Sequence, residues 1–333
     1  MKGADKLLPG TVITGKWNGN RYTVLKSLGK GANGAVYLVQ SSRGLEALKL
    51  SDNSMSITSE VNVLKHFSKV QGKSLGPRLY DTDDWTEGKA SPIRSFYVME
   101  YIKGLPFLDF IKAKGREWIP VLMLQLLGSL AELHKAGWAF GDLKPENLIV
   151  ADAPVGVRIV DVGGTTGMGR SIKEFTEFFD RGYWGMGMRK ADPQYDLFAA
   201  AMIALNAGTG GRFPKRENAQ QLLFDKIDSV PLLAGQRKVW RNALTGKYSS
   251  AEEMKKDLIE CIAAAGEKRT ERQRAGGQQR AASSAGAAPK KRSKPAAVKQ
   301  RKSSRSGSMM DAFIVVSGAF ILYALYIYHF LLP

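Results

Sequence analysis

The stretch that decides the fold is FGDLKPENLIV, residues Phe140–Val150. Within it Asp142 is followed two residues later by Lys144 and five residues later by Asn147, and the apolar run Leu148–Val150 predicts a strand directly afterwards. Phosphoryl transfer from ATP needs a carboxylate to orient the attacking hydroxyl, a cation on the moving phosphate and an oxygen ligand for Mg²⁺. Asp142, Lys144 and Asn147 supply these three groups on one short loop.

The loop reads Asp-Leu-Lys-Pro-Glu-Asn. It resembles the catalytic loop of Hanks-type protein kinases, and its Lys-Pro-Glu-Asn ending is typical of their serine/threonine branch. The resemblance implies that Asp142 is the catalytic carboxylate, that Lys144 steadies the γ-phosphate and that Asn147 binds Mg²⁺. The alternative is a plain helix start, with Asp142 as its N-cap and Pro145 in its first turn. Further motifs in the order of that family would decide between the two.

Gly29, Gly31 and Gly34 form a G-x-G-x-x-G pattern, and Val36 follows two residues later. Glycines at this spacing let the backbone close over phosphates and present its N–H groups without a Cβ in the way. A dinucleotide-binding turn has a similar pattern, but it continues into a helix, whereas Val36–Val39 predicts a returning strand. The pattern therefore favours a kinase-type nucleotide-binding loop that includes Val36.

The predicted strand Leu45–Leu50 carries Ala47 and Lys49, which we assign to the nucleotide site. In the resembled family a lysine at this place pairs with the α- and β-phosphates, and a helical glutamate holds it. Glu60, in the predicted helix Ser59–Val70, is the best candidate for that glutamate, although its distance of 11 residues from Lys49 is shorter than usual. An exposed strand lysine is the alternative reading of Lys49.

FYVMEYIKGLPF, residues Phe96–Phe107, predicts the last strand of a small lobe and the hinge after it. On the resemblance, Met99 is the gatekeeper, and backbone groups of Glu100 and Ile102 contact adenine. An ordinary buried strand fits this stretch as well.

Asp161-Val162-Gly163 follows another short apolar run, Val157–Val160. It matches the family's D-F-G motif with valine in place of phenylalanine, and it implies that Asp161 holds the Mg²⁺ that bridges the phosphates. The glycine-rich loop, lysine, catalytic loop and metal-binding aspartate thus occur in the family's order. We predict an α+β bilobal protein-kinase fold, with a β-rich N-lobe and a helical C-lobe, over about Arg21–Ala265.

One departure from the family pattern concerns regulation. Phe140-Gly141 replaces the His-Arg that usually precedes the catalytic aspartate, so a phosphorylated activation segment lacks its common counter-ion. We therefore expect basal activity to survive when the hydroxyl residues of this segment are replaced by alanine. These residues are Thr165, Thr166, Ser171 and Thr176.

A second departure concerns substrate docking. Tyr183 and Trp184 stand where the family has Ala-Pro-Glu, and Lys247 occupies the slot of the arginine that pairs with that glutamate. Both partners of one ion pair are absent together. The next motif is regular, since Tyr195 and Asp196 predict the start of the large central helix, with Asp196 as its buried anchoring carboxylate.

The bulk composition points to an anionic partner. The chain of 333 residues has 49 Lys and Arg against 31 acidic residues, a formal net charge of +18, which is typical of proteins that meet a polyanion or a membrane surface. Cys261 is the only cysteine, which excludes an intramolecular disulfide and suits a reducing cytoplasm. Met1–Gly10 has no apolar stretch of the kind a secretory signal needs.

Two-thirds of this charge lies in Lys268–Arg305, where 13 Lys and Arg accompany one acidic residue, Glu271, for a net +12 in 38 residues. Such a segment has too few apolar residues to fold alone, and its composition is similar to that of linker-histone tails. Release of counterions from phosphates predicts DNA binding without sequence preference. A solvated spacer that only fixes membrane topology is the alternative.

Ala312–Leu332 contains no Asp, Glu, Lys or Arg. Its 21 residues would span roughly 31 Å as a helix, against about 30 Å for the hydrocarbon core of a bilayer. The basic flank predicts that the N-terminal side stays inside. We therefore expect a single-pass anchor in the cell membrane, with the kinase domain cytoplasmic and the C-terminus outside.

The sequence thus divides into five predicted parts: an N-terminal extension (1–20), an N-lobe (21–103), a C-lobe (104–265), a basic disordered linker (266–308) and a transmembrane anchor (309–333). This layout resembles that of the YabT-type serine/threonine kinases of spore-forming bacteria. Membership implies ATP and Mg²⁺ as cofactors and protein Ser/Thr as substrates. It also implies phosphorylation coupled to DNA binding at the membrane, in sporulation or DNA damage. Separately, a basic segment that gathers several kinase molecules on one DNA strand predicts self-association there.

Two alternatives to this function remain open. A small-molecule or lipid kinase can also carry Gly141-Asp142, but Lys144-Pro145-Glu146 argues against it. The second alternative is a pseudokinase that tethers DNA to the membrane. The intact set of Lys49, Asp142, Asn147 and Asp161 argues against it, because a pseudokinase would not need these residues.

Overall fold

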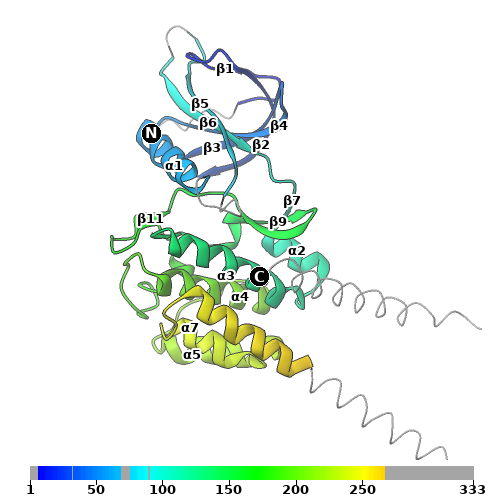
Figure 1. The fold of residues 1–333 in the computed structure, drawn as a ribbon, viewed down its shortest axis with the longest axis vertical. Helices are drawn as coiled ribbons and strands as arrows, with labels where there is room; N and C mark the ends of the chain where they lie inside the picture. Colours follow the sequence, from blue (N-terminus) through cyan, green and yellow to red (C-terminus); the bar gives the residue numbers. More distant parts are fainter. Residues whose placement is uncertain (1–6, 32, 69–75, 89–90, 267–333) are drawn as a thin grey trace, which may run out of the picture. The chain divides into compact units, whose positions relative to one another are not determined.

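The computed structural model describes residues 7–31, 33–68, 76–88 and 91–266. These residues lie in one of the chain's two units, Met1–Ala275. A sheet-rich N-lobe lies at one end of this unit and a helical C-lobe at the other (Figure 1), which confirms the predicted fold. The predicted DNA-binding segment Lys268–Arg305 and the predicted anchor Ala312–Leu332 lie outside the described residues. In the described part, no helix is long and apolar enough to cross a membrane.

The N-lobe is a six-stranded sheet in the order β1-β2-β3-β4-β6-β5, with neighbouring strands antiparallel. The register places Val36 opposite Lys49 and Ala47 opposite Met99. The sheet therefore brings the glycine-rich turn, the lysine strand and the hinge strand side by side. The strands are β1 (Val12–Thr14), β2 (Arg21–Gly31), β3 (Gly34–Ser41), β4 (Gly44–Ser51), β5 (Leu79–Trp85) and β6 (Arg94–Glu100).

The sheet begins earlier than Arg21. Strand β1 comes from the segment that the sequence analysis placed in an N-terminal extension, and it adds the fully buried Ile13 to the N-lobe core. Backbone N–H groups of Trp17 and Asn18 donate to the buried carboxylate of Asp83 on β5, which fixes the turn between β1 and β2. Residues 7–20 are therefore part of the lobe.

Helix α1 (Ser54–Phe67) packs against β4, β5 and β6. It begins five residues before the predicted start at Ser59, because the side chain of Asn53 accepts the N–H groups of Met55 and Ser56 and caps the helix there. The early start places Glu60 in the second turn, on the buried side of the helix. This explains how a glutamate only 11 residues after Lys49 can reach it.

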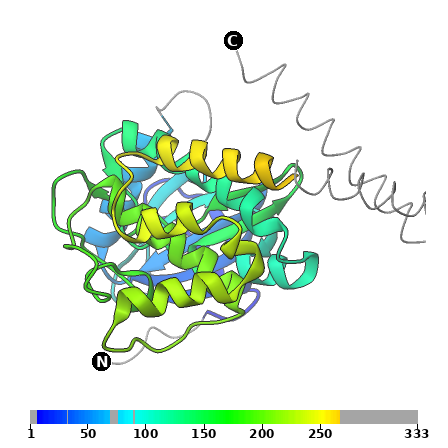
Figure 2. The same cartoon turned by 90° about the horizontal axis from the view of Figure 1, so that it is seen from below.

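The C-lobe is built around α4 (Pro193–Thr209), in which every residue from Tyr195 to Gly208 is buried. A helix that is buried on all sides is the centre of a domain, and α3, α5, α6 and α7 pack against it. The view from below shows the other helices of the lobe (Figure 2). They are α2 (Phe107–Lys114), α3 (Trp118–Lys135), α5 (Ala219–Ser229), α6 (Pro231–Ala234), α7 (Arg237–Leu244) and a helix at residues 251–266.

The described part of the C-lobe also contains short strands and 3₁₀ turns. One small sheet has the order β10-β9-β7, and another pairs β11 with β8. The first of these sheets flanks the turn η1, which holds the end of the catalytic loop. The elements are β7 (Gly104–Pro106), β8 (Trp138–Ala139), η1 (Pro145–Asn147), β9 (Leu148–Asp152), β10 (Val155–Ile159), β11 (Thr166–Gly167) and η2 (Glu177–Phe179).

Candidate active site

The loop that precedes Asp142 is held by the buried carboxylate of Asp196, as the sequence predicts. Asp196 is fully buried in α4 and accepts the backbone N–H of Phe140 at 2.7 Å, the N–H of Gly141 at 3.0 Å and Nε2 of His134 at 2.9 Å. Gly141 has φ of +83°, and a Cβ there would lie 2.5 Å from the carbonyl oxygen of Gly164. Glycine therefore fits this position directly before Asp142, where the family usually has an arginine.

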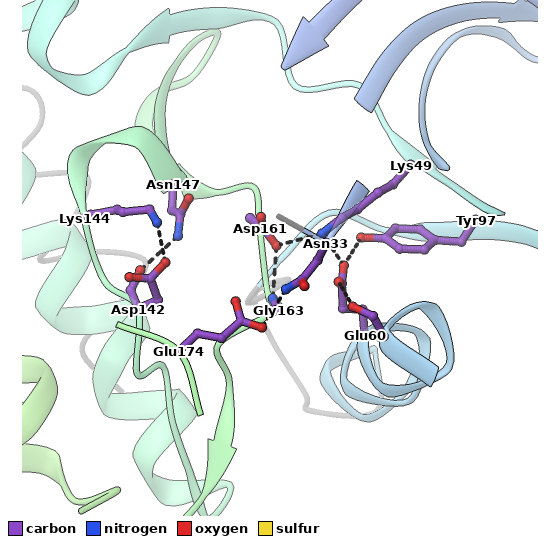
Figure 3. Close-up of polar contacts among 11 residues, drawn as sticks. Asn33, Lys49, Glu60, Tyr97, Asp142, Lys144, Asn147, Asp161, Gly163 and Glu174 are labelled. Atoms are coloured by element: carbon purple, nitrogen blue, oxygen red, sulfur yellow. Dashed lines mark hydrogen bonds and ion pairs between the residues drawn. The ribbon is translucent and has the colours of Figure 1, made fainter. Parts of the chain in front are cut away.

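Asp142 lies among the groups that the sequence analysis assigned to phosphoryl transfer (Figure 3). Its side chain pairs with the Lys144 ammonium, and its Oδ1 accepts the hydroxyl of Thr176 at 2.9 Å. Lys144 Nζ also donates to Thr176 Oγ1 at 3.2 Å. The amide of Asn147 donates to the backbone carbonyl oxygen of Asp142 at 2.9 Å. The catalytic loop and the activation segment thus meet at one carboxylate.

Lys49 connects the two lobes. Its ammonium lies 2.6 Å from Oε2 of Glu60 on α1 and 3.3 Å from Oδ1 of Asp161 in the C-lobe (Figure 3). Tyr97 donates its hydroxyl to the same Glu60 oxygen at 2.8 Å, and Ser56 donates to the other oxygen at 3.2 Å. Glu60 is therefore the glutamate that holds Lys49 in this structure.

Burial and charge act against each other at this pair. Burial lowers the pKa of Lys49, but the carboxylates of Asp161 and Glu60 outweigh it and leave the pKa above its ordinary value. The ammonium is therefore charged at neutral pH. Burial raises the pKa of Glu60, and Lys49 opposes this rise only in part. A buried cation with one of its two carboxylates in each lobe is well placed to receive a polyanionic ligand between them.

The residues predicted to bind Mg²⁺ have a donor set that fits this ion. Asn147 uses its Nδ2 to donate to the backbone of Asp142, which leaves its oxygen for a ligand. Asp161 is half exposed, and its Oδ1 accepts the Gly163 N–H at 3.0 Å, which fixes the carboxylate. Amide and carboxylate oxygens are the ligands that Mg²⁺ takes, usually one or two together with phosphate oxygens. Among the described residues, no group of three or more His, Cys, Asp or Glu side chains could hold a metal by itself.

The glycine-rich turn joins β2 to β3 next to this cluster. Gly34 has φ of +132°, and a Cβ there would lie 2.5 Å from the carbonyl oxygen of Leu50, so glycine is required. At Gly29 and Gly31 a Cβ would meet nothing within 4 Å. Packing within the chain therefore does not explain why these two positions are glycines. A phosphate bound under the turn would need the open space that they leave.

The residues predicted to contact adenine lie on the paired strands and at the hinge. Val36 is partly buried, and Ala47, Met99 and Ile102 are buried. The backbone N–H of Glu100 donates to the carbonyl of Arg78 at 2.8 Å, so Glu100 would meet adenine through its carbonyl oxygen. The structure thus places the predicted site residues along the junction of the two lobes.

Comparisons with known proteins agree with this geometry. The protein kinase domain model matches residues 22–279. The chain belongs to the protein kinase family. The serine/threonine-protein kinase YabT of Bacillus subtilis (strain 168) is 50% identical to it over 329 residues, which cover 99% of this chain and 97% of YabT.

Solved structures show the same fold. Vaccinia related kinase 3 aligns with a TM-score of 0.60 and 15% identity over 79% of this chain and 93% of its own. A double mutant of the PknI kinase domain of Mycobacterium tuberculosis aligns with a TM-score of 0.53 and 19% identity over 77% of this chain and 100% of its own. The predicted resemblance to Hanks-type kinases is confirmed, and members of this family generally use ATP and Mg²⁺.

Thr176 makes a contact that the sequence analysis did not predict. The sequence predicts that it is as dispensable for basal activity as the other three hydroxyls of the activation segment, yet its hydroxyl bridges Asp142 and Lys144. Thr165 and Thr166 are buried, so neither is a free surface hydroxyl in this structure, whereas Ser171 is exposed. No local pattern marks the bridge, because 34 residues separate Thr176 from Asp142. We therefore revise the expectation for Thr176 alone.

Replacing Thr176 by valine, which keeps the shape and removes the hydroxyl, is expected to slow phosphoryl transfer roughly 10- to 100-fold. A hydrogen bond to a charged group contributes about 1.5–3 kcal/mol, and here it holds the carboxylate that is predicted to be catalytic. Thr176→Ser should restore most of the rate, and Ser171→Ala in the same segment should leave it unchanged. Wild-type turnover in Thr176→Val, measured with radiolabelled ATP, would contradict this role.

A buried carboxylate, Asp180, holds the backbone of the segment in which the ion pair of the kinase family is missing. Its side chain is fully buried and accepts the backbone N–H groups of Gly182 at 3.0 Å and Tyr183 at 2.9 Å. It also accepts the Tyr195 hydroxyl at 2.9 Å and pairs with Arg189 at 2.7 Å. Asp180 could not be predicted from the sequence, because none of the family's motifs places a carboxylate there.

Asp180→Ala is expected to lower the melting temperature of the kinase by about 6–12 °C. Loss of these contacts costs roughly 3 kcal/mol, and each kcal/mol shifts Tm by about 2–4 °C in a domain of this size. Asp225→Ala is the matched control, because Asp225 is an exposed carboxylate with a hydrogen bond from Gln221. A Tm change in Asp180→Ala no larger than in the control, followed by tryptophan fluorescence, would show that Asp180 does not anchor the segment.

Proposed function

We propose that this kinase transfers the γ-phosphoryl group of MgATP to serine and threonine hydroxyls of proteins. The observation that carries the proposal is the Thr176 hydroxyl, which bridges Asp142 and Lys144 and so joins the activation segment to the catalytic loop. The 50% identity to a serine/threonine-protein kinase supports the choice of acceptor. The Lys144-Pro145-Glu146 sequence supports it against a small-molecule or lipid acceptor.

Asp142 would accept the hydrogen bond of the attacking hydroxyl, orient its oxygen and take up its proton. The Thr176 hydrogen bond at 2.9 Å fixes one carboxylate oxygen for this task. Lys144 sits beside the carboxylate and would meet the negative charge of the transferred group. Because Asp142 is only 9% exposed, bulk water has little access to this carboxylate.

On the N-lobe side, Lys49 would bind the α- and β-phosphates, since Glu60 and Asp161 keep its ammonium charged and in place. When bound, ATP with Mg²⁺ supplies the group to be transferred and the cation that neutralises its charge. Asn147 and Asp161 would hold Mg²⁺, and the N–H groups of the Gly29–Gly34 turn would cover the phosphates. Substitutions of Lys49 or Asp161 should therefore act on nucleotide geometry, whereas those of Asp142 act on the acceptor.

We propose further that Lys268–Arg305 binds DNA without sequence preference and that Ala312–Leu332 anchors the kinase in the cell membrane. The support is the net charge of +12 in the first segment and the 21 uncharged residues of the second. Attraction to an anionic bilayer fades within about 8 Å, whereas a flexible chain of 38 residues has a span of roughly 34 Å. Residues far from the anchor could thus hold DNA while those near it lie on lipid.

Affinity for DNA is expected to fall at least 1,000-fold between about 50 and 200 mM salt, since six or more released counterions give that dependence. DNA should also raise kinase activity, by gathering several kinase molecules on one strand. The measurement uses the full chain in detergent micelles with fluorescent duplexes of unrelated sequence.

The matched variant replaces the 13 Lys and Arg of 268–305 by glutamine and keeps the length of the segment. It should lose DNA binding and DNA stimulation and keep its basal turnover. DNA binding that survives this replacement would place the contact on the folded domain instead.

A further inference from the structure

A pocket of about 300 Å³ lies next to the catalytic carboxylate. It is lined by Thr176, Glu177, Phe178, Tyr183, Arg212 and Phe213. Thr176 belongs both to this lining and to the hydrogen bond with Asp142 Oδ1 at 2.9 Å. Successive residues of an extended peptide are about 3.3 Å apart. A side chain that enters the pocket would therefore come from a residue close to the acceptor hydroxyl.

The walls of the pocket are aromatic and held in place. Phe178 and Phe213 form an edge-to-face pair with centroids 5.1 Å apart, and Trp184 packs against both rings. The Trp184 indole donates to the carbonyl of Phe178 at 2.8 Å, and Asp180 fixes the backbone of Tyr183. The apolar surface is thus formed before any ligand arrives, which is the usual state of a binding pocket.

The charges at the pocket do not favour a basic ligand. Arg212 and Glu177 are the two charged residues of the lining and have opposite signs. Glu146 on the catalytic loop is two residues beyond Lys144 and would attract a substrate cation, but it pairs with Arg212. Lys215 adds a positive charge at the edge, where its ammonium donates to the carbonyl of Tyr183 at 2.6 Å.

We infer that this pocket receives a large apolar side chain next to the acceptor Ser or Thr of a protein substrate, and that the Arg212–Glu146 pair keeps basic side chains out. The inference rests on the proposed function, because it takes Asp142 as the group that orients the acceptor. Phe213 and Arg212 are then the residues that determine substrate choice. Phe213 forms an apolar wall that attracts an apolar side chain, and Arg212 pairs with Glu146 so that this carboxylate cannot bind a basic side chain of the substrate.

The test is a peptide array, phosphorylated by the full chain in detergent micelles, in which one Ser or Thr is flanked by a single varied residue. At one flanking position the wild type should prefer Leu, Met or Phe over Ala and Arg by about 10-fold, as expected for an apolar pocket. Phe213→Ala should reduce this preference to about 2-fold or less, measured against peptides with alanine at that position. Phe213→Leu, which keeps an apolar wall, should retain much of it and guards against loss of folding.

Arg212→Ala should free the Glu146 carboxylate and raise the rate with Arg or Lys peptides about 3-fold relative to apolar ones, as for an exposed ion pair. Arg241→Ala is the matched control. Arg241 also pairs with a carboxylate, Asp228 at 2.5 Å, and lies 4.7 Å over an aromatic ring, that of Phe224, but it is not part of the pocket lining. It should not change the peptide preference.

Unselective transfer, a wild-type preference for basic residues, or a preference that neither Phe213→Ala nor Arg212→Ala alters would overturn the inference and leave the proposed function standing. Absence of transfer to every peptide and to a general protein substrate would overturn the proposed function and this inference with it.

Discussion

Asp142→Asn is expected to lower the rate of phosphoryl transfer by about 100- to 10,000-fold, the range that a positioned acid or base contributes. The substitution keeps the size of the side chain but removes the charge that is proposed to orient the acceptor hydroxyl and take its proton. It also removes the carboxylate partner of Lys144. Binding of nucleotide should persist, because Lys49, Asn147 and Asp161 are untouched.

Asp152→Asn is the matched control for this experiment, since Asp152 is an exposed aspartate at the end of β9, the strand that follows the catalytic loop. The turnover of Asp152→Asn should equal that of the wild type. Both variants are compared by ³²P transfer and by the fluorescence of a bound nucleotide analogue. Comparable transfer rates in Asp142→Asn and Asp152→Asn would remove Asp142 from the catalytic role.

Lys49→Met is expected to reduce transfer by about 100- to 1,000-fold, the loss typical of removing one preorganised donor to developing charge. Methionine keeps the apolar stem of the side chain and loses the ammonium that lies between Glu60 and Asp161. Nucleotide affinity should fall as well, because the ammonium is the group proposed to meet the phosphates.

Folding must be checked in this variant, since removing one partner of a buried ion pair costs about 3–5 kcal/mol. Tyr97→Phe serves as the comparison. It removes the 2.8 Å hydrogen bond to Glu60 but leaves the Lys49–Glu60 pair, and it should slow transfer by no more than about 10-fold. If Lys49→Met folds, binds nucleotide and transfers phosphate at the rate of Tyr97→Phe, Lys49 has no catalytic part.

Local sequence patterns are enough to predict the parts of this site that lie within a few residues of one another. Asp142, Lys144 and Asn147 share one loop, and their spacing, together with the other motifs in the family's order, is enough to predict them. Glu60 is harder to choose, because the start of α1 depends on the cap at Asn53 and not on the apolar pattern of the helix. Because the helix begins at Ser54, Glu60 can reach Lys49 although only 11 residues separate them.

Contacts between distant segments could not be predicted in this way. The Thr176 hydroxyl reaches Asp142 across 34 residues, and nothing in the pattern around Thr176 distinguishes it from Ser171. Asp180 makes contacts to backbone N–H groups, an arginine and a tyrosine, and the absence of Ala-Pro-Glu did not reveal them. The contacts of Thr176 and Asp180 depend on how segments that are separated along the chain pack together in three dimensions.

The measurement that tests the central claim most directly is the chemical identity of the phosphorylated product. The full chain in detergent micelles that contain anionic lipid is incubated with γ-³²P-labelled ATP, Mg²⁺ and a general protein substrate, with Asp142→Asn in parallel. The account predicts that acid hydrolysis of the labelled protein yields phosphoserine and phosphothreonine, that chelation of Mg²⁺ abolishes the label, and that Asp142→Asn incorporates almost none. Label in the lipid fraction instead of protein, or equal labelling by wild type and Asp142→Asn, would contradict it.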